Sequence, residues 1–163
     1  MEDAMDALLQ ELERILARES ELFEKVLSLE SAKTPAIMDR DGSELKRLSE
    51  LQESLLEEIR SLEKDREKTV RGIRGRMPRS AAGSALSELM AENDSPLARA
   101  ALSRGQALRE IIGRLDGLSA SNARMIQDNM DFFNIMLSHL KSGVSAETGY
   151  GSDGKEETTG KAS

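Results

Sequence analysis

The stretch SPLARAALSRGQALREIIGRLDGLSASNARMIQDNMDFFNIMLSHL, residues 95–140, decides the fold of this chain. Ser95 can cap a helix, and Pro96 suits the first turn, where the N–H that proline lacks would have no partner anyway. No other proline follows before Leu140. The stretch therefore predicts one helix about 65 Å long, because each helical residue adds about 1.5 Å. A helix of this length favours an elongated molecule.

The apolar pattern changes half way along this helix. The first half carries a single stripe at coiled-coil spacing, made by Ala101, Leu108, Ile111, Ile112, Leu115 and Leu118. The second half carries two neighbouring stripes. One consists of Met125, Asn129, Phe132 and Met136, and the other of Ile126, Met130, Phe133, Leu137 and Leu140. One antiparallel neighbour would cover only one of the two. The other is expected to meet either a further helix of the same bundle or a partner protein, and its methionines suit an adaptable contact.

Two asparagines, Asn122 and Asn129, lie seven residues apart on the first of these stripes. A buried asparagine can set the register and the number of helices in a bundle. The alternative is that the two amides recognise a partner helix. The sequence leaves both interpretations open.

A first long helix is expected at residues 2–38. It carries a near-regular heptad seam made by Met5, Leu8, Leu12, Ile15, Leu22, Val26 and Leu29. Glu19 interrupts this seam. Pro35 predicts an end or a kink at Thr34, because proline removes a helical hydrogen bond and the residue before it disfavours helical angles.

A second long helix is expected at residues 43–75. Asp41 together with Glu44, or Ser43 alone, can cap its start, and two glycines and a proline at 72–78 can end it. Since the turn between the first two helices is short, they are expected to form an antiparallel hairpin.

Residues 64–79 hold seven basic side chains. In an antiparallel hairpin they lie beside the acidic first turns of the first helix, which favours this register, although each exposed ion pair contributes only about 0.2–1 kcal/mol. The same run is the one candidate for a nucleic-acid site. It lacks interleaved aromatic side chains, and the net charge of the chain is −7, so no binding of nucleic acid is expected.

These patterns predict an all-α fold: a long antiparallel helical hairpin plus a third long helix, in an elongated coiled-coil-like bundle. We expect one domain at residues 1–141, with a short helical turn at 87–91. Its long helices are expected at about 2–38, 43–75 and 95–141. Residues 142–163 are rich in glycine, serine and threonine. They offer too little apolar surface to order themselves, which predicts a disordered C-terminal tail.

Residues suited to catalysis are scarce. There is no cysteine and His139 is the single histidine, so neither a catalytic triad nor a cysteine- or histidine-rich metal site is expected. No nucleophile lies beside a base in the sequence pattern. We therefore expect no enzyme activity, no cofactor and no metal, and we expect His139 to pack or to face solvent. The acidic start lacks the features of a signal peptide, and no apolar run reaches about 18 residues, which predicts a cytoplasmic protein without membrane insertion.

Several short motifs follow one another in a distinctive order. They are LLQEL (8–12), ELFE (21–24), LLEEI (55–59), LEKDR (62–66), LSELM (86–90), LSASNARMI (118–126), FF (132–133) and YGSDG (150–154). In this order, over about residues 5–155, they resemble the FlgN-type flagellar export chaperones. The most specific part is the Asn-x-x-Met-Ile helix followed at a distance by Tyr-Gly-x-x-Gly in the tail.

This resemblance implies a cytosolic chaperone of the flagellar type III export system. Such a chaperone binds hook-filament junction (hook-associated) proteins through their helical C-terminal segments and delivers them to the export apparatus, with the export gate or the export ATPase complex as further partners. Helix-in-groove recognition would place a client helix along Ile126, Met130, Phe133 and Leu137. Tyr150 is the one large amphipathic side chain of the tail and is expected to anchor it on a partner. The alternative is a structural or adaptor coiled-coil protein that self-associates and has no export client.

Overall fold

The computed structural model describes residues 2–78, 83, 85–91 and 95–148. Within this part the chain forms four helices and no strand, which confirms the predicted all-α fold. The helices are α1 (Glu2–Met38), α2 (Gly42–Arg74), α3 (Leu86–Ala91) and α4 (Pro96–Thr148). The contacts divide the chain into two units, one at residues 1–119 and one that begins at Ala120. The single domain expected at 1–141 stays a prediction.

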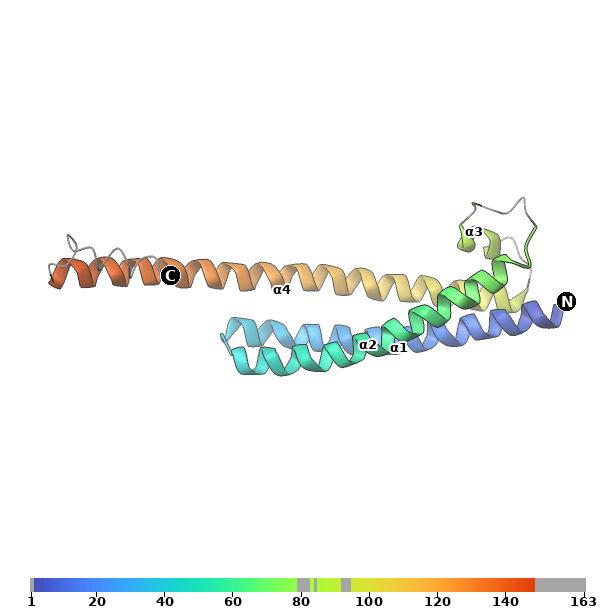
Figure 1. Cartoon of the computed structure of the whole chain (residues 1–163), viewed down its shortest axis with the longest axis horizontal. Coiled ribbons are helices and arrows are strands. Elements are labelled where there is room, and N and C mark those ends of the chain that lie inside the picture. The colour runs from blue at the N-terminus through green and yellow to red at the C-terminus, as the bar shows by residue number, and fades with distance from the viewer. Residues whose placement is uncertain (1, 79–82, 84, 92–94, 149–163) are drawn as a thin grey trace. The chain divides into compact units, whose positions relative to one another are not determined.

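Helices α1 and α2 form the predicted antiparallel hairpin. Figure 1 shows them side by side, joined by a tight turn. Asp41 is the N-cap of α2, because its side chain accepts a hydrogen bond from the backbone N–H of Glu44 at 3.0 Å. The predicted cap is thus confirmed, and α2 begins and ends within one residue of the predicted bounds.

Pro35 does not end α1, which continues to Met38. The side chains of Ala36 and Ile37 are buried, so the last turn is held by apolar contacts beyond the proline. The Pro35 carbonyl also accepts the N–H of Asp39 at 2.9 Å. The predicted bounds 2–38 are therefore confirmed, and the end considered at Thr34 is wrong, because tertiary burial outweighs the local preference.

The α1–α2 turn is a Schellman motif. The N–H of Asp41 donates to the Ala36 carbonyl at 2.8 Å, and the N–H of Arg40 donates to the Ile37 carbonyl at 3.1 Å. Arg40 occupies the position that usually holds glycine, and its φ of 54° lies in the left-handed region. A side chain with a Cβ is strained there.

We predict that Arg40→Gly is more stable than Arg40→Ala by about 1 kcal/mol, because only glycine adopts the left-handed angle without a Cβ clash. For a chain of this length, this corresponds to a difference of about 2–4 °C in Tm. Both variants lose the same side chain, so a comparison of their thermal unfolding isolates the backbone effect. Equal Tm values would show that the turn carries no such strain.

Helices α1 and α2 contribute to both apolar clusters in residues 1–119, and α1 supplies the most buried residues. The first cluster joins Leu9, Leu12 and Leu16 of α1 to all three other helices. Their contributions are Ile73 from α2, Met90 from α3, and Ala98, Ala101 and Leu108 from α4. The second cluster joins Leu22 and Val26 of α1 to Ile59 of α2. The first turns of α4 therefore pack on the hairpin as its third helix.

Gly72 lies inside α2 rather than at its end. A Cβ built on this residue would come 3.1 Å from the Cδ2 atom of Leu8. The missing side chain thus lets α1 and α2 approach closely at this level. The sequence identified Gly72 as part of a helix stop, whereas the structure uses it for packing and ends α2 at Arg74.

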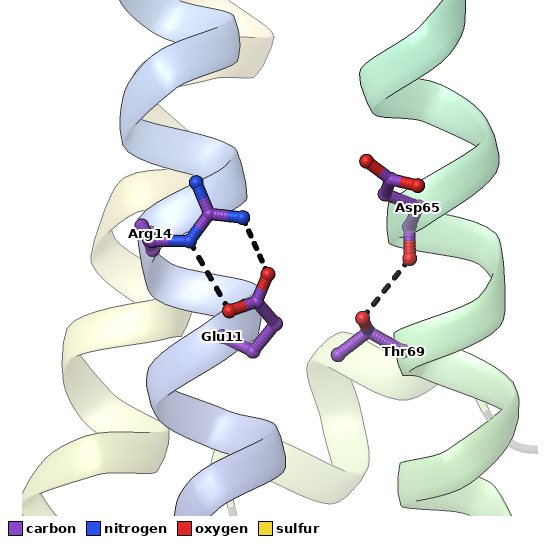
Figure 2. Close-up of polar contacts among 4 residues, drawn as sticks. All are labelled: Glu11, Arg14, Asp65 and Thr69. Atoms are coloured by element: carbon purple, nitrogen blue, oxygen red, sulfur yellow. Dashed lines mark hydrogen bonds and ion pairs between the residues drawn. The ribbon is translucent and has the colours of Figure 1, made fainter.

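Several buried polar side chains of the hairpin form hydrogen bonds with nearby side chains or backbone carbonyls. The Gln52 amide donates to the Val26 carbonyl at 3.1 Å and to the Glu30 carboxylate at 2.9 Å. The buried Thr69 hydroxyl donates to the carbonyl of Asp65, one turn earlier in α2, at 3.0 Å (Figure 2). These bonds allow polar groups to lie inside the seam without the cost of an unmet hydrogen bond.

The predicted charge pairing between residues 64–79 and the start of α1 takes a different form. Glu11 pairs with Arg14 of its own helix, as Figure 2 shows, and this hydrogen bond lowers the pKa of Glu11. Glu13 pairs with Arg104 of α4 at 3.6 Å. Arg66 of the basic run pairs instead with Glu19, with 3.4 Å between its Nε atom and the carboxylate.

Glu19 is a buried polar residue of the hairpin whose hydrogen bonding is incomplete. Its side chain is 1% exposed, and its Oε1 atom has no hydrogen-bond partner among the described residues. Burial raises the pKa of Glu19, and the nearby Arg66 guanidinium offsets only part of this effect. The seam interruption found in the sequence is therefore a carboxylate that the fold disfavours in its charged form.

We predict that Glu19→Gln raises the Tm at pH 7 by about 2–4 °C and leaves it unchanged at pH 4. The folded-state pKa of Glu19 lies above its ordinary value of 4.5, so its contribution to stability is largest below pH 4.5 and is lost as the pH rises through the folded pKa. Thermal unfolding across pH 4–8 checks this. The exposed Glu58→Gln is the control and should not stabilise the protein. A lower Tm for Glu19→Gln at pH 7 would mean that the ion pair with Arg66 outweighs burial.

Helix α4 starts where the sequence predicts and ends later. The N–H of Leu97 donates to the Ser95 hydroxyl at 3.2 Å, which confirms the cap. The helix continues to Thr148 instead of stopping near residue 141. Residues 142–148 contain no proline, and the single glycine there costs a helix only about 1 kcal/mol. The rest of the predicted tail, including Tyr150, lies outside the described residues.

Candidate functional site

In the second unit, the described residues form the last part of α4, and this part presents many large apolar side chains to solvent. Those that are exposed are Ile126, Met130, Phe132, Phe133, Ile135, Met136 and Leu140. A surface of this kind is unusual for a soluble helix, because contiguous exposed apolar side chains generally mark an interaction site.

The four predicted contact residues follow one line along the helix. Ile126, Met130, Phe133 and Leu137 are spaced by four, three and four residues, which places them on one face. Ile126 is 39% exposed, Met130 54% and Phe133 57%, while Leu137 is half-buried. We call these four residues the α4 surface. The structure thus brings together the residues named from the sequence.

The neighbouring stripe, which contains Asn122 and Asn129, is less exposed than the α4 surface at several of its positions. Phe132 and Met136 are exposed, whereas Met125 and Asn129 are half-buried. Asn122 is 2% exposed, so its amide is not available to a partner. For Asn122 the structure therefore favours a role within the fold over recognition of a partner helix.

Sequence reasoning missed one exposed apolar residue. Ile135 is 56% exposed but belongs to neither stripe. It lies nine residues after Ile126, which places it on the opposite side of the helix at about 100° per residue. Because Ile135 lies outside the periodic pattern, nothing in the sequence indicated its exposure. Its place on the opposite side makes it a useful control for the α4 surface.

The chemistry offered by this region is apolar contact. His139 is exposed, which is one of the two placements expected for it. In the described part of the chain, histidine and acidic side chains do not gather in a group of three that could hold a metal ion. Gln127 and Asp131, one turn apart, join in a surface hydrogen bond of 3.0 Å. Polar residues of this kind flank the α4 surface and keep the helix hydrated.

Among the residues that the structure describes, no helix combines the length and the apolar content that crossing a membrane requires.

The exposed side chains can supply the energy of a specific contact. Burying one phenylalanine, methionine or isoleucine side chain completely contributes about 1.5–3 kcal/mol. Covering Ile126, Met130 and Phe133, the exposed members of the α4 surface, would therefore contribute several kcal/mol to a contact.

Comparison with known families gives a match over almost the whole chain. The family model described as FlgN protein matches residues 1–158. No curated protein and no solved structure matches the chain significantly.

Proposed function

The chain belongs to the FlgN family of flagellar export chaperones, and we propose that its clients are the hook-filament junction proteins. FlgN is a family of chaperones rather than of enzymes. In this proposal the protein works in the cytoplasm, binds the helical C-terminal segments of these clients and delivers them to the flagellar type III export apparatus.

The observation that supports client binding is the line of exposed side chains on the α4 surface. Met130 and Phe133 are each more than half exposed, although such residues usually lie in a core. A client segment that folds as an amphipathic helix before secretion would cover them and hide its own apolar face at the same time. Both surfaces would then be protected from aggregation until export.

We predict that Phe133→Asp weakens binding of a purified C-terminal segment of a hook-filament junction protein by at least about tenfold. The change removes a contact of about 1.5–3 kcal/mol and places a charge in the interface. Isothermal titration calorimetry measures the two dissociation constants. Ile135→Asp is the matched control, because Ile135 is equally exposed, on the opposite side of the same helix.

Each other result has a definite meaning. Loss of binding in Ile135→Asp alone would place the client on the other face. Unchanged binding in both variants would leave the function standing and refute the α4 surface. If the parent protein bound no junction protein and formed a stable oligomer instead, a self-associating coiled-coil protein would be the better account.

The proposal also assigns a role to Tyr150: it docks the client-loaded chaperone on the export gate or the export ATPase complex. Its support is the sequence alone, since Tyr150 is the one large amphipathic side chain in residues 142–163. We predict that Tyr150→Ala reduces either client binding or secretion of the junction proteins at least several-fold. Calorimetry and the amount of junction protein in the culture medium check the two steps. Tyr150→Phe is the control for the hydroxyl, and wild-type values for Tyr150→Ala in both assays would refute the role.

A further inference from the structure

A second candidate binding site lies within residues 1–119, apart from the α4 surface. It is a groove of about 680 Å³ to which all four helices contribute. Its apolar wall is made by Leu12, Leu16, Val70, Met90, Leu108 and Ile112. This volume is in the range of sites that bind small ligands or part of a peptide.

The charge around this groove is opposite to that of the whole chain. Arg66 and Arg109 line it, with Glu88 as its acidic member. A smaller adjoining cavity shares Arg66 and Val70 with the groove and adds Arg71 and Arg74 against Glu67. Together the two linings hold four arginines and two glutamates, with the buried Glu19 beside Arg66, in a protein whose net charge is −7. Such a local excess of positive charge favours an anionic occupant.

The arginines differ in how far their charge is already neutralised. Arg66 pairs with the buried Glu19, at 3.4 Å. Arg71 and Arg109 form no ion pair with any residue that the structure describes. Their guanidinium groups can therefore each donate hydrogen bonds to a carboxylate from outside the chain without breaking an existing ion pair.

Helix α3 shows what kind of element this site accepts. It has six residues, which is too short for a helix that is stable by itself, so its position depends on packing. Leu86 and Met90, one turn apart, pack against the apolar cluster next to the groove, and Glu88 lies between them in sequence. The resident element is thus a short amphipathic helix with one acidic residue.

The α4 wall of the groove has room for a close backbone approach. Gly105 lines it without a side chain, and a Cβ built there would meet only the Leu16 Cδ1 atom, at 4.0 Å. On α4 the lining residues extend from Ala101 to Ile112, about three turns. This length suits a helix of two to three turns better than a compact small molecule.

From these features we propose that the groove binds an acidic amphipathic helix of a partner protein. Its leucines or methionines would pack on the half-buried Val70, Leu102 and Ile112, and its glutamates would pair with Arg71 and Arg109. The residues of this groove belong to residues 1–119, whereas the α4 surface belongs to the second unit.

The test uses two fluorescein-labelled 16-residue peptides that are stapled into a helix. Both carry leucine every three or four positions, with glutamate at the flanking positions in one peptide and lysine in the other. Fluorescence anisotropy measures their dissociation constants with the full-length protein, and methyl NMR locates the contact at the half-buried Val70, Leu86, Leu102 and Ile112. We expect the glutamate peptide to bind at least tenfold more tightly than the lysine peptide.

Three variants connect this binding to the groove. Arg109→Glu should weaken the glutamate peptide at least tenfold, whereas Arg114→Glu, at an exposed arginine of α4 outside the groove, should change it less than twofold. Gly105→Leu should block binding by filling the groove, and it should not unfold α4, because leucine is a better helix former than glycine. Phe133→Asp should bind the glutamate peptide like the parent protein.

The remaining outcomes overturn the proposal. Equal affinity for both peptides would remove the charge argument, and tight binding by Gly105→Leu would place the peptide elsewhere. Loss of binding in Phe133→Asp would assign the peptide to the α4 surface, whether or not that surface holds junction proteins. If the methyl NMR signals of the groove shifted when sodium decanoate was added, but not when either peptide was added, the groove would be a site for a small amphiphilic anion.

Discussion

The structure of residues 1–119 depends on the burial of α1. Both apolar clusters contain α1 residues, and one of them joins α1 to α2, α3 and the start of α4. Helix α2 also contributes to both clusters, but α1 supplies more of their buried residues than any other helix. Since α1 is buried on more than one side, its polar residues cannot all reach water, and the hairpin must accommodate Glu19 and Glu30 inside. The positions of these two carboxylates then constrain how α2 lies along α1.

The two buried carboxylates are accommodated in different ways. Glu30 accepts a hydrogen bond from Gln52 and pairs with Lys33, so its burial is compensated. Among the described residues, the one partner of Glu19 is Arg66, in the ion pair of 3.4 Å. Removing Arg66 or Gln52 would leave a buried carboxylate without that partner, and shifting α2 along α1 would do the same. These polar pairs therefore oppose a slip in register that an entirely apolar heptad seam would tolerate.

The two units use apolar residues in opposite ways. In residues 1–119 the apolar stripes are buried against one another, while from Ala120 onward large side chains such as Met130 and Phe133 stay exposed. The sequence showed this difference as a change from one stripe to two, so the four residues of the α4 surface could be named without a structure. It could not show the groove, because residues as distant as Leu12, Val70, Met90 and Ile112 line it together. Nor could it identify Ile135, which no periodic pattern includes.

The amino-acid sequence by itself determined the helices, the caps at Asp41 and Ser95, and the hairpin, because these depend on residues close together in the chain. Only the tertiary structure decided the features that depend on distant contacts. Pro35 stays inside α1 because Ala36 and Ile37 are buried beyond it. Gly72 stays inside α2 because Leu8 packs against it. Local rules describe what a segment prefers alone, and burial against another helix can outweigh that preference by several kcal/mol.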